Sequence, residues 1–171
     1  MIDKLWEATL SRIIKKDKHL RNTVKKYGND ILNTPSYQQS KDFIQHGKKS
    51  VFQHSIDVAK MSLKISRTLP FQFKESELVR GALLHDYFLY DWHDLKISIK
   101  NPKDFFKLHG FTHANTALKN AKRDFVLSEN EKEIIKKHMW PLNIKPPMSR
   151  EAWVVTMADK ICSIKETVHR R

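Results

Sequence analysis

The amino-acid sequence predicts an all-α fold, and three observations support this prediction. Glycine and proline are scarce, with 4 and 6 residues among 171. Alternation of apolar and polar residues, which is typical of half-buried strands, is hard to find. Apolar residues recur instead at helical spacing over most of the chain. We therefore expect residues 1–171 to form one compact bundle of about seven helices.

Two helices are expected in the N-terminal part of the chain. Residues 2–26 carry apolar side chains close to helical spacing, and the stretch "YGND" predicts the end of this helix. Residues 35–46 begin with Pro35, which is favoured in the first turn of a helix. They predict a second helix that ends near "HGKKS".

The middle of the chain predicts two further helices. Ser50 is a suitable N-cap for a helix that reaches about Thr68, and "LPF" then interrupts it. Residues 75–90 predict the next helix. Its apolar residues between 78 and 84 favour a central position in the bundle.

Three helices are expected in the C-terminal part. A polar connection that contains Pro102 precedes a predicted helix at about residues 112–124. Ser128 and Glu131 form a capping-box pattern for a helix that reaches His138. The proline-rich stretch "WPLNIKPPMS" predicts a loop, and residues 149–168 predict the last helix.

The composition indicates which binding partners and which cellular environment to expect. The net charge of +13 favours anionic partners such as nucleotides, nucleic acid or acidic surfaces, although a solvated lysine-rich surface explains it equally well. No apolar run approaches the roughly 18 to 20 residues of a membrane span, and "MIDKLWEATLSRIIKK" lacks the apolar region of a secretory signal. Cys162 is the single cysteine, which favours a reducing compartment. A cytoplasmic location is expected.

The dipeptide His-Asp occurs twice, as His85-Asp86 and as His93-Asp94. The first pair lies in the apolar predicted helix, whereas the second lies among aromatic and polar residues and is interpreted as the polar exit of that helix. His54 and Asp159 also lie on apolar faces of predicted helices. A carboxylate in such a place is costly unless it is paired or bound to a metal, so a buried salt bridge remains open for Asp159.

Together these residues offer a ligand set for a divalent metal. Two imidazoles and two carboxylates, from His54, His85, Asp86 and Asp159, can fill four positions of an octahedron. Water in the remaining positions would be acidified to a nucleophile. His85 and Asp86 are about 100° apart on a helix, so both reach one ion only if it lies across the helix edge. The interpretation also requires three helices to converge.

The ordered stretches "QHSIDVA", "LLHDY" and "MADK" resemble the HD superfamily of metal-dependent phosphohydrolases over about residues 43–165. The resemblance implies an all-α fold in which His54, His85, Asp86 and Asp159 bind one metal. It also implies hydrolysis of phosphate esters, often in nucleotides, by a metal-bound water. In this interpretation residues 1–42 form N-terminal helices and residues 43–168 form the metal-binding core of a single HD-type domain.

The stretches "HGFTHANTALKNA" and "KKHMWPL" are similar to the subgroup that carries a second metal. The resemblance implies that Asp86 bridges two ions and that His113 and His138 bind the second one. We prefer His113 because small residues follow it, and His109 is the alternative. The chain departs from some members in two places. Leu89 stands where they carry lysine or glutamate, and Met139 follows His138 where they carry a second histidine.

His46 and Lys160 are the candidate substrate-binding residues. His46 precedes Lys48 and Lys49, which are possible phosphate partners, although a surface loop explains this stretch equally well. Lys160 lies beside Asp159. Histidine-rich ligation favours one or two ions of manganese, iron, cobalt, nickel or zinc over magnesium.

The sequence therefore predicts a metal-dependent phosphohydrolase, with Asp86 as its catalytic residue and a small phosphorylated molecule, most simply a nucleotide, as its substrate. Two other classes stay open. One is a non-catalytic, metal-stabilised module that senses a ligand. The other is a basic helical domain that binds nucleic acid.

Overall fold

The computed structural model describes residues 2–46, 49–88 and 102–168, and gives the backbone alone for residues 2–14, 46 and 102–112. The predicted all-α class is confirmed, and the described residues contain seven α-helices, one short 3-10 helix and one small hairpin. These elements are α1 (Ile2–Leu32), α2 (Pro35–Gln38), η1 (Gln39–Lys41), β1 (Ile44–His46), β2 (Lys49–Ser50), α3 (Val51–Ser66), α4 (Glu75–Leu84), α5 (Pro102–Asp124), α6 (Glu129–Lys137) and α7 (Arg150–Val168).

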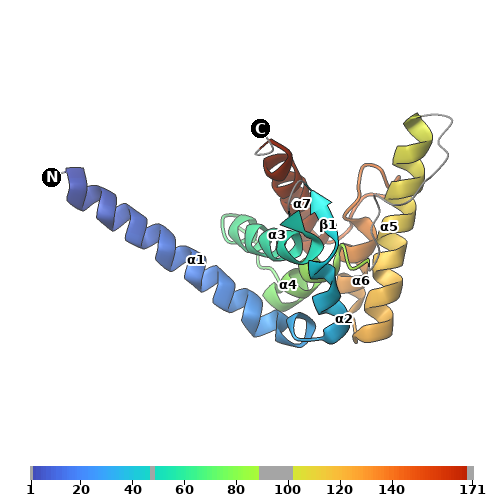
Figure 1. The fold of residues 1–171 in the computed structure, drawn as a ribbon, viewed down its shortest axis with the longest axis horizontal. Helices are drawn as coiled ribbons and strands as arrows, with labels where there is room; N and C mark the ends of the chain where they lie inside the picture. Colours follow the sequence, from blue (N-terminus) through green and yellow to red (C-terminus); the bar gives the residue numbers. More distant parts are fainter. Residues whose placement is uncertain (1, 47–48, 89–101, 169–171) are drawn as a thin grey trace.

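Helix α4 is the central element of the bundle, as its apolar sequence predicts. It contacts α1, α3, α5, α6 and α7, and Figure 1 shows α3, α7 and α6 arranged around it, with α5 beyond α6. Every residue of α4 from Gly81 to Leu84 is buried, and so are the partners Leu63 on α3 and Val155 on α7. The helices that carry the candidate site residues therefore share one core.

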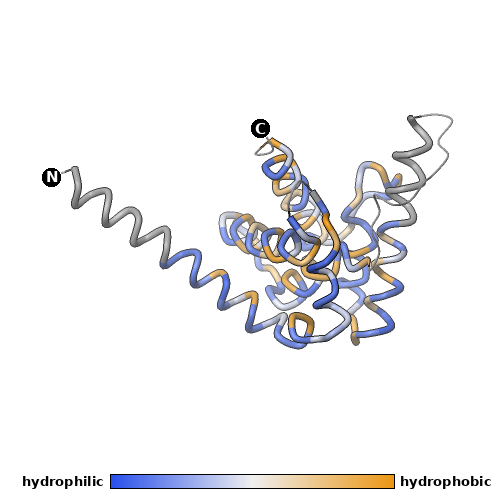
Figure 2. The backbone as a smooth tube through the Cα atoms, viewed as in Figure 1, coloured by the Kyte–Doolittle hydropathy of each residue, from blue (hydrophilic) through white to orange (hydrophobic). Residues whose placement is uncertain are grey.

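The described part of α1 has one buried side and one exposed side. Leu20, Val24 and Ile31 are buried against the core, whereas the lysines between residues 15 and 26 are exposed. Figure 2 shows this segment as mainly hydrophilic with hydrophobic positions at intervals. The lysines thus form a solvated face. No helix among residues 2–46, 49–88 and 102–168 is both long and apolar enough to cross a bilayer.

Two predicted helix starts are confirmed by their cap hydrogen bonds. The Ser50 side chain accepts a hydrogen bond of 3.3 Å from the Gln53 backbone N–H at the start of α3. At the start of α6 the Ser128 side chain accepts from the Glu131 N–H at 3.1 Å, and the Glu131 carboxylate accepts from the Ser128 N–H at 2.8 Å. This is the complete capping box that the sequence indicates.

Two predictions for the N-terminal part are wrong. The first helix does not stop at "YGND" but continues to Leu32. Gly28 serves close packing there, because a Cβ atom at this position would lie 2.2 Å from Leu83 Cδ1. The predicted helix over residues 35–46 is also too long, since residues 44–46 form strand β1, which pairs with β2. This hairpin leads the chain directly into the Ser50 cap.

The predicted boundaries around the His-Asp pair also need correction. The helix expected over residues 75–90 ends at Leu84, and the helix expected at 112–124 begins at Pro102. Tyr87 and Phe88, after the helix end, are fully buried. The Tyr37 hydroxyl donates to the Leu83 carbonyl at 2.8 Å, and the Asn120 amide donates to the Tyr87 carbonyl at 3.1 Å. Tertiary contacts therefore hold the exit from α4, which helical periodicity cannot reveal.

Gly81 allows α4 and α6 to approach each other closely. A Cβ atom at position 81 would lie 2.6 Å from Ile134 Cδ1 and 2.8 Å from its Cγ2. Gly81→Ala should lower the free energy of unfolding by about 1 kcal/mol, because overpacking outweighs the gain in helix propensity. Urea denaturation measures this value. In an Ile134→Ala background the penalty should shrink, and a stabilised Gly81→Ala single variant would contradict the packing argument.

Asp124 joins α5 to α2 and to the exit of α4. Its Oδ2 accepts hydrogen bonds from Tyr87 at 2.7 Å and from Ser36 at 3.3 Å. The Arg123 hydrogen bonds and these hydroxyl donors lower the pKa of Asp124 from 3.8 to about 2, against the effect of burial. Ionised Asp124 therefore stabilises the fold above its unfolded-state pKa, and this contribution is lost as the pH falls through its folded-state pKa.

We expect the difference in unfolding free energy between the wild type and Asp124→Asn to be constant near neutral pH. It should shrink between about pH 4 and pH 2, where the carboxylate becomes protonated. Urea titrations at a series of pH values measure this difference. The exposed Asp42, changed to asparagine, serves as the matched control. A pH-independent difference for Asp124→Asn would show that its charge does not stabilise the fold.

Candidate metal centre

Six buried histidine and aspartate side chains from five helices or their ends converge at one place. They form two groups that share Asp86, and within each group the potential ligand atoms lie within 4.8 Å of one another. The first group comprises His54, His85, Asp86 and Asp159, and the second comprises Asp86, His113 and His138. The structure thus brings together all six residues for which the sequence predicts a metal-binding role.

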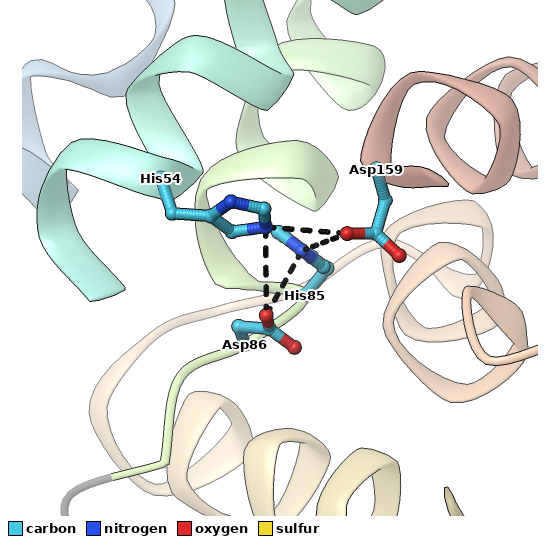
Figure 3. A group of neighbouring side chains, drawn as sticks. All are labelled: His54, His85, Asp86 and Asp159. Atoms are coloured by element: carbon cyan, nitrogen blue, oxygen red, sulfur yellow. Dashed lines mark hydrogen bonds and ion pairs between the residues drawn. The ribbon is translucent and has the colours of Figure 1, made fainter. Parts of the chain in front are cut away.

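The first group joins α3, the end of α4 and α7, and Figure 3 shows its side chains pointing toward one another. His54 Nε2 lies 3.2 Å from Asp159 Oδ1 and 3.8 Å from Asp86 Oδ2. His85 Nε2 lies 3.3 Å from Asp86 Oδ2 and 3.7 Å from Asp159 Oδ1. Two imidazole nitrogens and two carboxylate oxygens therefore face one shared point.

The second group uses the other oxygen of Asp86. His113 Nε2, from α5, lies 2.6 Å from Asp86 Oδ1, and His138 Nε2, at the end of α6, lies 3.2 Å from the same atom. Phe88 packs against the His113 ring with a centroid separation of 4.1 Å. Asp86 therefore presents Oδ2 to the first group and Oδ1 to the second, which is the arrangement that a bridging carboxylate requires.

The His-Asp pair lies at the end of α4. His85 is the C-cap residue of α4, and the backbone turns after it. His85 keeps helical torsion angles (φ −59°, ψ −35°), so the two side chains leave the helix end about 100° apart and reach the first group across the helix edge, as the sequence suggested. His85 stays against the first group, while Asp86 reaches both groups.

Backbone contacts fix the proton positions on two of the histidines. His85 Nδ1 lies 2.7 Å from the Ala82 carbonyl, and His138 Nδ1 lies 2.7 Å from the Ile135 carbonyl. A carbonyl oxygen only accepts, so each Nδ1 donates, and in the neutral ring Nε2 carries a lone pair. Both Nε2 atoms are buried and make no hydrogen bond within the described part of the chain.

These lone pairs face the carboxylate oxygens of Asp86, which are also acceptors. Two acceptors attract each other only when a proton or a metal ion lies between them. Metal-binding histidines usually donate their other ring N–H to a carbonyl or carboxylate, as His85 and His138 do. The donor set and its buried, unsatisfied nitrogen atoms therefore fit divalent metal ions.

The buried histidines and carboxylates of the centre stabilise each other's charged forms against the effect of burial. Burial by itself would lower the pKa of His54, but hydrogen bonds to Asp159 and Glu166 raise it to about 9. Burial opposes protonation of His85 too, but the charge of Asp86 raises its pKa to about 10. Burial would raise the pKa of Asp86, yet the neighbouring imidazoles hold it well below its usual range. Protons and a metal ion therefore compete for the same nitrogen atoms.

Two buried polar residues at the centre were not predicted. The Glu166 carboxylate accepts a hydrogen bond from His54 Nδ1 at 2.9 Å, and the Gln45 amide donates to Asp86 Oδ2 at 2.6 Å. Glu166 follows Asp159 by seven residues, which places both on one helix face, so this spacing was a usable signal. No sequence pattern indicated a role for Gln45, because its strand was predicted as part of a helix.

The candidate substrate-binding lysines lie in different surroundings. Lys160 is half-buried and donates to the His138 carbonyl at 3.2 Å, beside the second group. Lys49, a possible phosphate partner, contacts the carboxylates of Asp57 and Glu166 instead. The side chains of His46 and His109 lie outside the described residues, and so do residues 89–101 and with them Leu89 and the pair His93-Asp94.

The fold and the buried centre agree with a match to a known protein family. An all-α bundle with a buried histidine–aspartate centre after its central helix defines a class of helical metal-binding domains. Residues 51–164, more than half of the chain, match the HD domain, and the chain belongs to this family. It is an HD-type metal-dependent phosphohydrolase with an intact His/Asp site. Searches among curated proteins and among solved structures gave no match.

The two groups predict separable metal binding. His138→Ala removes a ligand of the second group only, so we expect the weaker of two binding events to lose at least about tenfold in affinity. The first event should persist, because His54, His85 and Asp159 are unchanged. Equilibrium dialysis against Zn²⁺ or Mn²⁺ with elemental analysis measures both events. His19→Ala, at an exposed histidine of α1, is the control. Unchanged binding of the second ion by His138→Ala would contradict the assignment.

Proposed function

We propose that this phosphohydrolase cleaves a phosphate ester or anhydride in a small phosphorylated molecule, and that this molecule is a nucleotide. The observation that carries the proposal is the shared Asp86, which directs one carboxylate oxygen to each of two histidine groups. The resemblance of "LLHDY" and its partner motifs to nucleotide-hydrolysing HD proteins supports the substrate class. The net charge of +13 also favours an anionic substrate.

In this proposal the first metal is held by His54, His85, Asp86 and Asp159, and the second by Asp86, His113 and His138. The histidine-rich donor set favours manganese, iron, cobalt, nickel or zinc over magnesium. When bound, such ions supply Lewis acidity, which lowers the pKa of a water molecule and neutralises charge on phosphate oxygens.

The protein residues contribute positioning and charge. Asp86 stays ionised between the imidazoles, and the Gln45 amide holds its Oδ2. Lys160 uses one N–H on the His138 carbonyl, which leaves donors for a phosphate group, since an ammonium has three. Burial lowers the pKa of Lys160. We assign Lys160, together with His46 on β1, to substrate binding.

A hydrolysis screen tests the proposed substrate class. Protein loaded with Mn²⁺, Co²⁺ or Zn²⁺ is incubated with nucleoside mono-, di- and triphosphates, dinucleotides and a generic phosphodiester, and the products are identified chromatographically. We expect turnover of at least one nucleotide, and its loss on addition of a chelator. Stable metal binding without turnover of any nucleotide would contradict the proposed substrate class.

Asp86→Ala is the decisive variant for the catalytic assignment. It removes the carboxylate shared by both groups, so metal binding and hydrolysis should fall to background together. Asp42→Ala, at an exposed aspartate, is the control and should behave as the wild type. Metal analysis and the nucleotide assay are run on the same preparations, with circular dichroism as a check of the fold. An Asp86→Ala protein that retains both properties would refute the proposal.

A further inference from the structure

Helix α7 presents two carboxylates to opposite sides of the same imidazole ring. Asp159 and Glu166 are seven residues apart, so they lie on one face of the helix two turns from each other. Asp159 Oδ1 lies 3.2 Å from His54 Nε2, and Glu166 Oε2 lies 2.9 Å from His54 Nδ1. His54 itself is fully buried. Its ring is therefore held between two acidic side chains.

The contact between His54 Nδ1 and Glu166 favours a ring proton on Nδ1 and a lone pair on Nε2. Both ring nitrogens of His54 face carboxylates, which only accept hydrogen bonds, so a metal ion that replaces the proton on Nε2 would leave the ring N–H on Nδ1, toward Glu166. Nε2 then carries the lone pair, and it faces Asp159 and Asp86. A carboxylate that fixes a histidine in this way orients the ring and makes it a better metal ligand.

Glu166 is placed where a carboxylate is unfavourable for folding. Its side chain is 4% exposed, and it lies in the last turns of α7, where the helix dipole disfavours negative charge. Lys49 on β2 compensates it, with Nζ 3.3 Å from Glu166 Oε1. Lys49 also pairs with Asp57 on α3. The hairpin before α3 thus supplies a cation that compensates the charge of Glu166 beside His54.

We propose that Glu166 is a positioning residue for the metal centre, which fixes the tautomer and ring orientation of His54, and that Lys49 holds Glu166 in place. This inference rests on the proposed metal-binding role of His54. Both residues lie outside the matched range of residues 51–164, so the family match does not assign them. The segments that flank the HD domain would then complete its metal site.

The test compares the wild type with Glu166→Gln, which keeps the shape but removes the charge. We expect Glu166→Gln to weaken Zn²⁺ binding at the first site about 10- to 100-fold, measured by competition with a chromophoric chelator. Asp57→Asn is the matched control, because it also removes a carboxylate partner of Lys49 and should leave this affinity near the wild-type value. Circular dichroism verifies folding of each variant.

A second readout reports the hydrogen bond to Glu166 directly and needs no variant. In ¹H–¹⁵N spectra of the Zn²⁺-loaded wild type, the His54 Nδ1–H should be shifted downfield and should exchange slowly with water, because it donates to the buried Glu166 carboxylate. A His54 Nδ1–H that exchanges rapidly and is not shifted downfield, or a folded Glu166→Gln protein with wild-type affinity, would overturn the role of Glu166 alone. If Glu166→Gln does not fold, the spectrum of the wild type decides. A wild type that binds no Zn²⁺ would instead overturn the proposed metal centre, and this inference with it.

Discussion

Asp86 is the residue on which the rest of the centre depends, because its buried carboxylate lies among four imidazoles. His54 and His85 approach Oδ2, while His113 and His138 approach Oδ1. A buried ion is stable only when its charge and its lone pairs are compensated. Each imidazole comes from a different part of the chain, so the chemistry of one carboxylate requires the packing of the whole bundle.

The fold meets this requirement through the end of α4. The helix stops at Leu84, and burial of Tyr87 and Phe88 directs the chain back into the core. Close packing at Gly81 brings α6, and with it His138, against the same region. The fixed Nδ1 contacts of His85 and His138 with backbone carbonyls then turn both Nε2 atoms toward Asp86. Backbone geometry, more than side-chain freedom, orients these two imidazole rings.

Much of the site could be predicted from the sequence, because its residues are polar groups on otherwise apolar helix faces. Asp159 among apolar neighbours is the clearest case, and the Ser128 capping box is equally local. The end of α4 could not be predicted, since it depends on contacts from Tyr37 and Asn120 that lie far away in the chain. The contact of Gln45 with Asp86 could not be predicted either, because the sequence of the short strand β1 resembles a helix end in composition.

Binding of metal ions on both sides of Asp86 is the property on which the proposed chemistry depends. Anomalous diffraction from crystals grown with Zn²⁺ or Mn²⁺ locates such ions without reference to activity. We expect one peak among His54, His85, Asp159 and Asp86, and a second peak beside His113 and His138, with Asp86 between them. Crystals that show no anomalous peak next to Asp86, at metal concentrations that support hydrolysis, would contradict the central claim.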